Sequence, residues 1–249
     1  MSFRGWLDGA VILILGGTAE GRRLAEALTG RAAVLSLAGR TRDPLTAGQV
    51  RLGGFGGVEG LRGYLREHGV TAVVDATHPF AAVMSRNAAA ACAAEGVALL
   101  RLVRPSWASH PAAGSWHWVD GHGEAARRAA ALGARPFLTV GRQHTADYVA
   151  DLADADVLAR VAEPPVAFLP ARWTLVTSRG PFTLDGEREL MAAHGIDVLV
   201  AKDAGGAHTD AKLSVAAERG AAVVMIRRPA APAGVPEVAD VAGALTWLG

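Results

Sequence analysis

Short apolar runs alternate along this chain with longer segments in which apolar residues recur at helical spacing. Continuous apolar runs bounded by glycine, proline or polar residues are typical of buried parallel strands. We predict strands at Val11–Leu15, Ala33–Leu37, Ala72–Asp75, Ala98–Val103, Pro136–Val140, Val157–Val161, Thr174–Ser178, Asp197–Ala201 and Ala222–Ile226. We predict helices at Gly21–Leu28, Val58–Glu67, Phe80–Glu95 and Glu237–Leu248. This alternation predicts an α/β fold with mainly parallel sheets.

The alternation breaks between Arg104 and Gly123, a stretch of Pro, Ser, His and Gly that also holds three tryptophans. We interpret this stretch as a linker, which predicts one domain at residues 1–104 and a second at 105–249. The two halves end alike, since Gly96–Pro105 and Gly220–Pro229 keep the same spacing from Gly to Pro. We therefore expect two Rossmann-like lobes with a cleft between them. Any helix followed by a strand and its exit can produce the same likeness.

A glycine turn follows the first predicted strand and opens a helix. Its residues are Gly16, Gly17, Thr18, Ala19, Glu20 and Gly21. Gly16 and Gly21 hold the outer positions of the dinucleotide-binding fingerprint, whereas Thr18 replaces the middle glycine. Such a turn presents backbone N–H groups and the positive end of a helix dipole to a phosphate. A tight turn without a ligand is the alternative.

The segment after the second predicted strand contains Gly39, Arg40 and Thr41 where an NAD-binding chain carries an acidic residue. An arginine there pairs with a 2′-phosphate, which favours NADPH over NADH. A solvated loop arginine is the alternative. Farther along, the glycine-rich run Gly53–Gly57 surrounds Phe55, which suits either contact with a flat ligand or plain turn chemistry.

Polar residues follow further predicted strands. Thr77 and His78 come after the third strand, where Thr77 can cap a helix or bind a cofactor, and His78 can orient a carboxamide or move a proton. In the second half, cations stand beside hydroxyl, amide or glycine groups at three strand ends; these residues are Arg142, Ser178, Arg179 and Lys202, with Lys212 in the next helical region. Cations gathered at strand ends suit a ligand with several carboxylates.

Charge, hydrophobicity and cysteine content indicate which classes of partner this protein is not expected to bind. The formal net charge of +1 gives no reason to expect nucleic acid, and no apolar run is long enough to span a membrane. The single cysteine, Cys92, allows no disulfide within the chain, which suits a cytoplasmic protein. The histidines and Cys92 form no spaced ligand motif, so we expect no protein-held metal.

In their joint order, several motifs resemble the precorrin-6A reductase family of cobalamin biosynthesis over nearly the whole chain. They are Gly16–Gly21, Ala38–Thr41, Gly53–Gly57, Asp75–Phe80, Ser178–Phe182 and Met225–Pro229. The chain departs from the family pattern at Ala204, where a serine is expected. The resemblance implies that the first lobe binds NADPH and the second binds the substrate, a tetrapyrrole-derived macrocycle with many carboxylates, of which one double bond is reduced to give precorrin-6B.

With that resemblance, the glycine turn would hold the pyrophosphate, and Arg40 with its neighbours the 2′-phosphate. Thr77 and His78 would flank the nicotinamide. The macrocycle would contact Phe55, Arg142, Ser178, Arg179, Lys202 and Lys212, and the proton donor would be His78, Lys202 or Asp203. The resemblance also allows transient contact with neighbouring enzymes of the pathway. A cobalt-containing substrate, a non-catalytic two-lobed binding protein and another Rossmann enzyme, such as a methyltransferase, are the alternatives.

Overall fold

The computed structural model describes residues 11–38, 49–206 and 210–249, and the chain divides into two compact units. The first unit comprises Met1–Arg104 and Pro229–Gly249, and the second comprises Pro105–Arg228. The first predicted domain boundary coincides with the passage between units after Arg104. The assignment of residues 105–249 to one domain differs from the structure, because the C-terminal segment joins the first unit.

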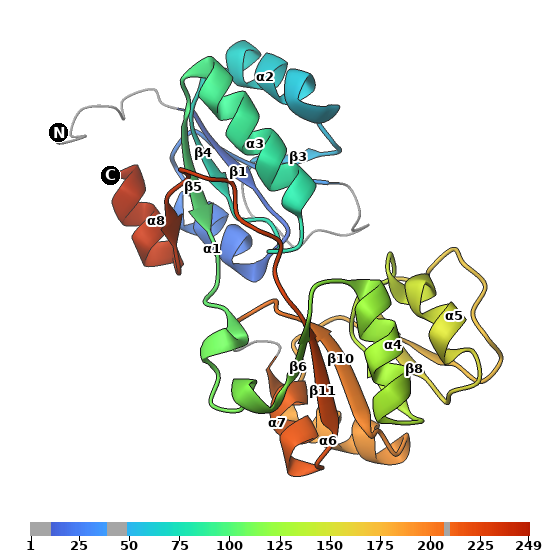
Figure 1. Ribbon diagram of the computed structural model, residues 1–249. Coiled ribbons are helices and arrows are strands. Elements are labelled where there is room, and N and C mark those ends of the chain that lie inside the picture. Colours follow the sequence, from blue (N-terminus) through green and yellow to red (C-terminus); the bar gives the residue numbers. More distant parts are fainter. Residues whose placement is uncertain (1–10, 39–48, 207–209) are drawn as a thin grey trace. The chain divides into compact units, whose positions relative to one another are not determined.

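The first unit contains a six-stranded parallel sheet (Figure 1). Its strands, in spatial order, are β12 (Glu237–Val238), β5 (Ala98–Leu102), β4 (Val70–Asp75), β1 (Val11–Leu15), β2 (Ala33–Leu37) and β3 (Gln49–Leu52). Read from β3, this is the 3-2-1-4-5-6 order of dinucleotide-binding domains. The C-terminal segment supplies the sixth strand, since Glu237 pairs with Arg101 and Val238 with Leu102 in parallel register. This pairing explains why the segment belongs to the first unit.

The second unit contains another six-stranded parallel sheet. Its strands, in spatial order, are β6 (His117–Val119), β11 (Ala222–Ile226), β10 (Val198–Lys202), β7 (Pro136–Leu138), β8 (Leu158–Val161) and β9 (Thr174–Thr177). The spatial order matches that of the first sheet, but here the sixth position is taken by the first strand of the unit. Two parallel sheets flanked by helices confirm the predicted fold class.

The strands β5 and β11 occupy equivalent places in their two sheets, each next to the edge strand. This equivalence accounts for the similar endings of the two halves of the sequence. Gly96 and Gly220 have positive φ values of 66° and 67° and end the helices that precede β5 and β11. Only glycine adopts this conformation readily, and it ends many helices for that reason. Each of these strands then leads to an Arg-Pro pair at which the chain passes between units.

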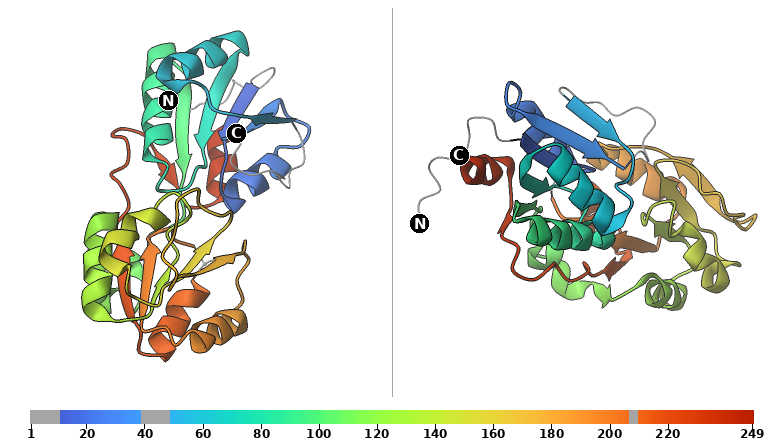
Figure 2. Two further views of the ribbon diagram at one scale, coloured as in Figure 1. Left: turned by 90° about the vertical axis from the view of Figure 1, so that its right-hand side faces the viewer. Right: turned by 90° about the horizontal axis from the view of Figure 1, so that it is seen from above.

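Helices cover both faces of each sheet (Figures 1 and 2). The first unit has α1 (Ala19–Ala27), α2 (Gly57–Glu67), α3 (Ala82–Glu95) and α8 (Val241–Leu248); the second has α4 (His122–Leu132), α5 (Val149–Leu152), α6 (Leu184–Ala193) and α7 (Ala211–Glu218). Alternate residues of β1 face opposite ways. Ile12 and Ile14 pack toward α1 and α8, while Leu13 and Leu15 pack toward α2 and α3. Burial on both faces makes the strand a continuous apolar run.

Three predictions about elements were wrong in detail. The stretch expected to be a linker belongs to the second unit from Pro105 onward and includes β6, because Trp107 and Trp116 are buried in that unit's core. The closing helix begins at Val241, and Asp240 caps it by accepting from the Gly243 N–H at 2.8 Å. The strand β3 was missed, since it alternates polar and apolar residues over a short span. No helix among the described residues is long and apolar enough to cross a membrane.

Candidate functional site

The glycine turn and the loop after β4 lie side by side in the first unit. Connections from β1 and β4 leave in opposite directions along the sheet, and ligands of open α/β sheets bind at such a switch point. The Thr18 hydroxyl donates to the carbonyl of Ala76 at 2.8 Å and so ties the two loops together. Thr18 also accepts from the Gly21 N–H at 3.1 Å and caps α1. The hydroxyl at this middle position makes both bonds, which a glycine could not make.

Close packing at Gly16 and Gly21 and the backbone conformation at Gly17 disfavour larger residues in the turn. A Cβ at Gly16 would lie 2.6 Å from Leu35 Cδ1, and one at Gly21 would lie 3.1 Å from the Ala76 Cβ. Gly17 has a φ of +141°, which L side chains rarely adopt. Gly16 thus lets the strand pass Leu35, and Gly21 lets α1 approach the loop after β4. The turn leaves the first N–H groups of α1 directed beyond the carboxyl end of β1, the arrangement that binds phosphates.

Glu20 places a buried carboxylate in the first turn of α1. It is 8% exposed, and it pairs with Arg23 at 3.6 Å and with Arg104 at 3.8 Å. Burial lowers the pKa of Arg104. The two guanidiniums offset a negative charge that would otherwise repel a phosphate at this helix end.

Asp75 organises the loop after β4, a role that the sequence did not reveal. Its Oδ1 accepts from the Thr77 hydroxyl at 2.6 Å and from the Thr77 N–H at 3.1 Å, and its Oδ2 accepts from the Ser85 hydroxyl at 2.6 Å. Arg101 Nε lies 3.6 Å from the same Oδ2. The carboxylate is 2% exposed, so these donors replace the water it loses. Thr77 is therefore held by Asp75.

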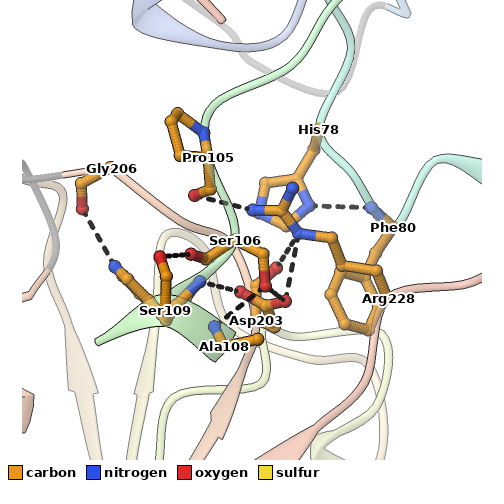
Figure 3. A network of polar contacts seen from close by, with 10 residues as sticks. His78, Phe80, Pro105, Ser106, Ala108, Ser109, Asp203, Gly206 and Arg228 are labelled. Carbon is orange, nitrogen blue, oxygen red and sulfur yellow. Dashed lines mark hydrogen bonds and ion pairs between the residues drawn. The ribbon is translucent and has the colours of Figure 1, made fainter. Parts of the chain in front are cut away.

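The His78 ring is oriented by its own backbone neighbourhood. Its Nδ1 accepts from the Phe80 N–H at 3.2 Å, as the dashed line in Figure 3 shows. An accepting Nδ1 leaves the proton of a neutral imidazole on Nε2. His78 therefore presents Nε2 as its donor.

Phe55 packs within the first unit. The guanidinium carbon of Arg51 lies 3.9 Å from the Phe55 ring centroid, and Tyr64 meets the ring edge-on at 5.2 Å. Arg51 also donates to the carbonyls of Gly53 and Gly54 at 2.6 and 2.9 Å, which fixes the glycine-rich loop. The predicted contact of Phe55 with substrate stays a prediction. Gly39, Arg40 and Thr41 lie outside the described residues.

In the second unit, the switch point lies between β7 and β10. Lys202 ends β10, and its Nζ lies 3.8 Å from the position of a Cβ added at Gly141, which follows β7. Gly141 has a φ of +82°, so a side chain there would be strained as well as close to the ammonium. Burial lowers the pKa of Lys202 to about 8.

Two predicted substrate-binding arginines meet at a carboxylate that the sequence did not single out. Arg142 Nη1 lies 2.7 Å from Glu163 Oε2, and Arg179 Nη2 lies 3.2 Å from Glu163 Oε1. Both arginine side chains stay accessible, at 39% and 48% exposure. The N–H of Ser178 donates to the Val161 carbonyl at 2.9 Å, so this residue continues the pairing of β8 with β9. Glu163 thus holds two cations side by side at the carboxyl edge of the sheet.

Two histidines at this edge were missed because they lie far apart in the sequence. The rings of His122 and His144 stack at 3.8 Å, His122 Nδ1 lies 3.0 Å from the Tyr148 hydroxyl, and His144 Nδ1 lies 2.8 Å from Asp147 Oδ2. Burial, followed by His144 and Lys202, lowers the pKa of His122 to about 4. Donor atoms of His122, His144 and Asp147 lie within 4.8 Å of one another, so the expectation of no protein-held metal stays a prediction.

Asp203 anchors the segments by which the chain enters and leaves the second unit (Figure 3). Its Oδ2 accepts from the Ser106 hydroxyl at 2.6 Å, and its Oδ1 accepts from the Trp107 N–H at 2.9 Å. Arg228 Nε lies 3.2 Å from Oδ2 and donates to the Asp203 carbonyl at 2.8 Å. The carboxylate is 3% exposed. These contacts hold the two segments against Asp203, and its predicted role as a proton donor stays a prediction.

Lys212 lies in α7 and is 7% exposed, with its ammonium 4.9 Å from the centroid of the Trp107 ring. A cation over an aromatic face is held by the ring quadrupole. Its predicted contact with substrate stays a prediction.

Comparisons with known proteins agree with these features. A family model described as precorrin-6x reductase CbiJ/CobK matches residues 11–249. A precorrin-6A reductase of Rhodococcus erythropolis is 50% identical over 242 residues, which are 96% of this chain and 97% of that protein. A cobalt-precorrin-6A reductase of Salmonella typhimurium is 30% identical over 236 residues, covering 88% and 87%.

The fold gives the same result. A solved structure titled CobK precorrin-6A reductase superposes with a TM-score of 0.86 at 44% identity, covering 96% of each chain. Sequence and structure agree over nearly the full length, including the C-terminal segment that completes the first sheet. This chain belongs to the precorrin-6x reductase CbiJ/CobK family.

Proposed function

We propose that this protein reduces one double bond of precorrin-6A to give precorrin-6B in cobalamin biosynthesis, with NADPH as the hydride donor. The observation that carries this proposal is the glycine turn beside the Asp75–Phe80 loop at the switch point of a 3-2-1-4-5-6 sheet. Dinucleotides bind at that place in sheets of this order. Family membership supports the reaction, and a reductase of this family needs a nicotinamide cofactor.

The first unit supplies the cofactor contacts. The N–H groups of Gly16–Gly21 and the start of α1 would bind the pyrophosphate, while Thr77 and His78 would flank the nicotinamide. His78 would contact the carboxamide and thereby orient the ring. Arg40, which follows β2 in the sequence, binds the 2′-phosphate together with its neighbours Gly39 and Thr41.

The second unit supplies the contacts for the carboxylates of the macrocycle. Arg142, Arg179 and Lys202 are cations at the carboxyl edge of its sheet, and each arginine uses one nitrogen in its ion pair with Glu163. The other nitrogens of these accessible side chains bind substrate carboxylates. Ser178 and Lys212 add a hydroxyl and a second ammonium, and Phe55 of the first unit contacts the ring.

Bound NADPH would supply a hydride to one carbon of the double bond, and a proton would add to the neighbouring carbon. The nucleotide would leave as NADP⁺, so electrons and charge would balance. Of the three predicted proton donors, Asp203 is engaged by Ser106, Trp107 and Arg228, and we assign His78 to the carboxamide. Lys202 remains, and its lowered pKa of about 8 suits a general acid near neutral pH. The protein contributes by positioning two large ligands and excluding water.

Calorimetric titration with NADPH and NADH at equal ionic strength tests the cofactor assignment. We expect NADPH to bind at least tenfold more tightly, because a charge-assisted pair with the 2′-phosphate contributes on the order of 1.5–3 kcal/mol. Arg40→Ala removes that preference and leaves NADH affinity unchanged. Equal affinities for the two nucleotides, or a preference that survives in Arg40→Ala, would contradict the assignment.

The cobalt-containing substrate is the second candidate. The metal-free substrate is favoured because identity to the precorrin-6A reductase of Rhodococcus is 50%, against 30% to the cobalt-precorrin-6A reductase of Salmonella. Turnover of each substrate under identical conditions distinguishes them, and we expect the larger kcat/KM with precorrin-6A. Binding of both without turnover would favour a non-catalytic binding protein.

A further inference from the structure

The loop between β8 and β9 carries the two most exposed large apolar side chains of the described residues. Val166 is fully exposed, at 105%, and Phe168 is 95% exposed. The other large exposed apolar residues range from Leu175 and Leu184 at 37% to Val83 at 64%. A single exposed apolar residue needs no explanation, but two at nearly full exposure in one loop mark a candidate contact surface.

This loop is anchored at both ends. At its start, Glu163 is held by Arg142 and Arg179. At its end, Trp173 is 9% exposed, donates through Nε1 to the Leu152 carbonyl at 3.0 Å, and closes a turn with the Pro170 carbonyl at 3.0 Å. The two apolar side chains are therefore displayed by a loop whose ends are fixed.

The composition of the loop adds stiffness. It contains Pro164, Pro165 and Pro170 and forms no helix, although most parallel strands of this molecule are joined through one. Proline fixes φ and reduces the conformations that an unbound loop samples. A stiff loop loses little entropy when a ligand covers its apolar side chains. An exposed phenylalanine in such a loop is preorganised for contact.

We infer that Phe168 and Val166 form an apolar contact for the macrocycle and help to determine the affinity for the tetrapyrrole, an inference that rests on the proposed function. Val166 and Phe168 come three and five residues after Glu163. At about 3.4 Å per extended residue they lie within roughly 10 and 17 Å of it. Cations beside apolar side chains match a ligand with an apolar ring and a rim of carboxylates. A purely anionic cofactor would use the cations and leave Phe168 uncovered.

Steady-state kinetics of Phe168→Ala with precorrin-6A and NADPH test this inference. We expect KM for precorrin-6A to rise about tenfold or more, as for removal of one aromatic side chain from an apolar contact, with KM for NADPH unchanged within twofold. Phe168→Tyr keeps the ring and stays near the wild-type KM. Val83→Ala removes another exposed apolar side chain, 64% exposed, from α3 and serves as the control. Because Phe168 is exposed, its removal leaves the melting temperature unchanged, which separates the effect from misfolding.

The outcomes separate this inference from the proposed function. A wild-type protein that does not reduce precorrin-6A at all contradicts the proposed function itself. A wild-type protein that turns over, with KM for precorrin-6A unchanged in Phe168→Ala, overturns the inference alone. Sedimentation of wild type and Phe168→Ala tests whether a second copy of the chain covers Val166 and Phe168 instead. A wild-type dimer that is lost in Phe168→Ala, with KM for precorrin-6A unchanged, would assign these side chains to a dimer interface and overturn the inference.

Discussion

Replacing Thr18 by valine removes one hydroxyl from the junction of the two cofactor loops while keeping the shape of the side chain. Two bonds are lost, the cap to the Gly21 N–H at 3.1 Å and the donation to the Ala76 carbonyl at 2.8 Å. Loss of a helix cap costs about 1 kcal/mol, and loss of a buried hydrogen bond about another 1 kcal/mol. Because Thr18 is 7% exposed, water does not replace the hydroxyl. We expect the first unit to lose about 2 kcal/mol of stability.

Native-state hydrogen exchange gives the opening free energy of each unit separately, from slowly exchanging amides in its central strands. Two threonines provide graded controls. Thr183 caps α6 through one bond to the Gly186 N–H at 3.2 Å in an exposed position, and Thr183→Val costs about 1 kcal/mol in the second unit. Thr29 donates to the Glu26 carbonyl at an exposed turn, and Thr29→Val costs less than about 0.5 kcal/mol.

Thr18→Ser, which retains the hydroxyl, stays close to wild type. The reasoning fails if Thr18→Val and Thr29→Val have equal effects, or if Thr18→Ser loses as much stability as Thr18→Val. Either result would show that the hydroxyl of Thr18 does not join the two loops. NADPH affinity measured on the same variants reports whether the loosened turn still presents its N–H groups to the pyrophosphate; we expect it to fall about tenfold in Thr18→Val alone.

Three further predictions follow from contacts. Gly60→Ala would place a Cβ 1.6 Å from the Phe55 carbonyl oxygen, so we expect the free energy of unfolding to fall by at least about 2 kcal/mol. A Cβ at Gly63 in the same helix meets nothing within 4 Å, so Gly63→Ala should raise that free energy by up to about 1 kcal/mol. Urea unfolding measures both. With Lys202 as general acid, we expect kcat to be constant below the Lys202 pKa of about 8 and to fall tenfold per pH unit above it. If the pH profile of Lys202→Met keeps the same inflection, the inflection belongs to another group and the assignment is contradicted. Arg179→Met raises KM for precorrin-6A about tenfold and leaves KM for NADPH unchanged, and equal changes in both would contradict its assignment to substrate.

The strands that could be predicted are those buried on both faces. Residues 11–15 and 222–226 are continuous apolar runs because helices cover both sides of their sheets, and the prediction matched the structure there. The strands β3, β6 and β12 were missed because they span only two to four residues and each mixes polar with apolar residues. Local pattern carries no information about the pairing of Glu237 with Arg101, which joins residues far apart in the sequence.

Prediction of the candidate site was limited in the same way, because local sequence pattern does not show contacts between distant residues. Gly16, Gly21 and the strand-end cations were identified from local spacing, because a turn after a strand has a local signature. Asp75, Glu163 and His122 were not, because each acts through residues brought near by the fold: Ser85 and Arg101, the two arginines, and His144. The one signal available in the sequence was the position of Asp75 at the end of an apolar strand, where a carboxylate needs partners.

Incubation of the protein with precorrin-6A and NADPH deuterated at the transferable position of the nicotinamide tests the central claim most directly. We predict oxidation of one NADPH per macrocycle, with the product carrying one deuterium from the cofactor and one hydrogen from solvent. Mass spectrometry of the tetrapyrrole and absorbance of the nucleotide report both in one experiment. A product without deuterium, or an unchanged macrocycle in the presence of bound NADPH, would contradict the assignment of this chain as the reductase.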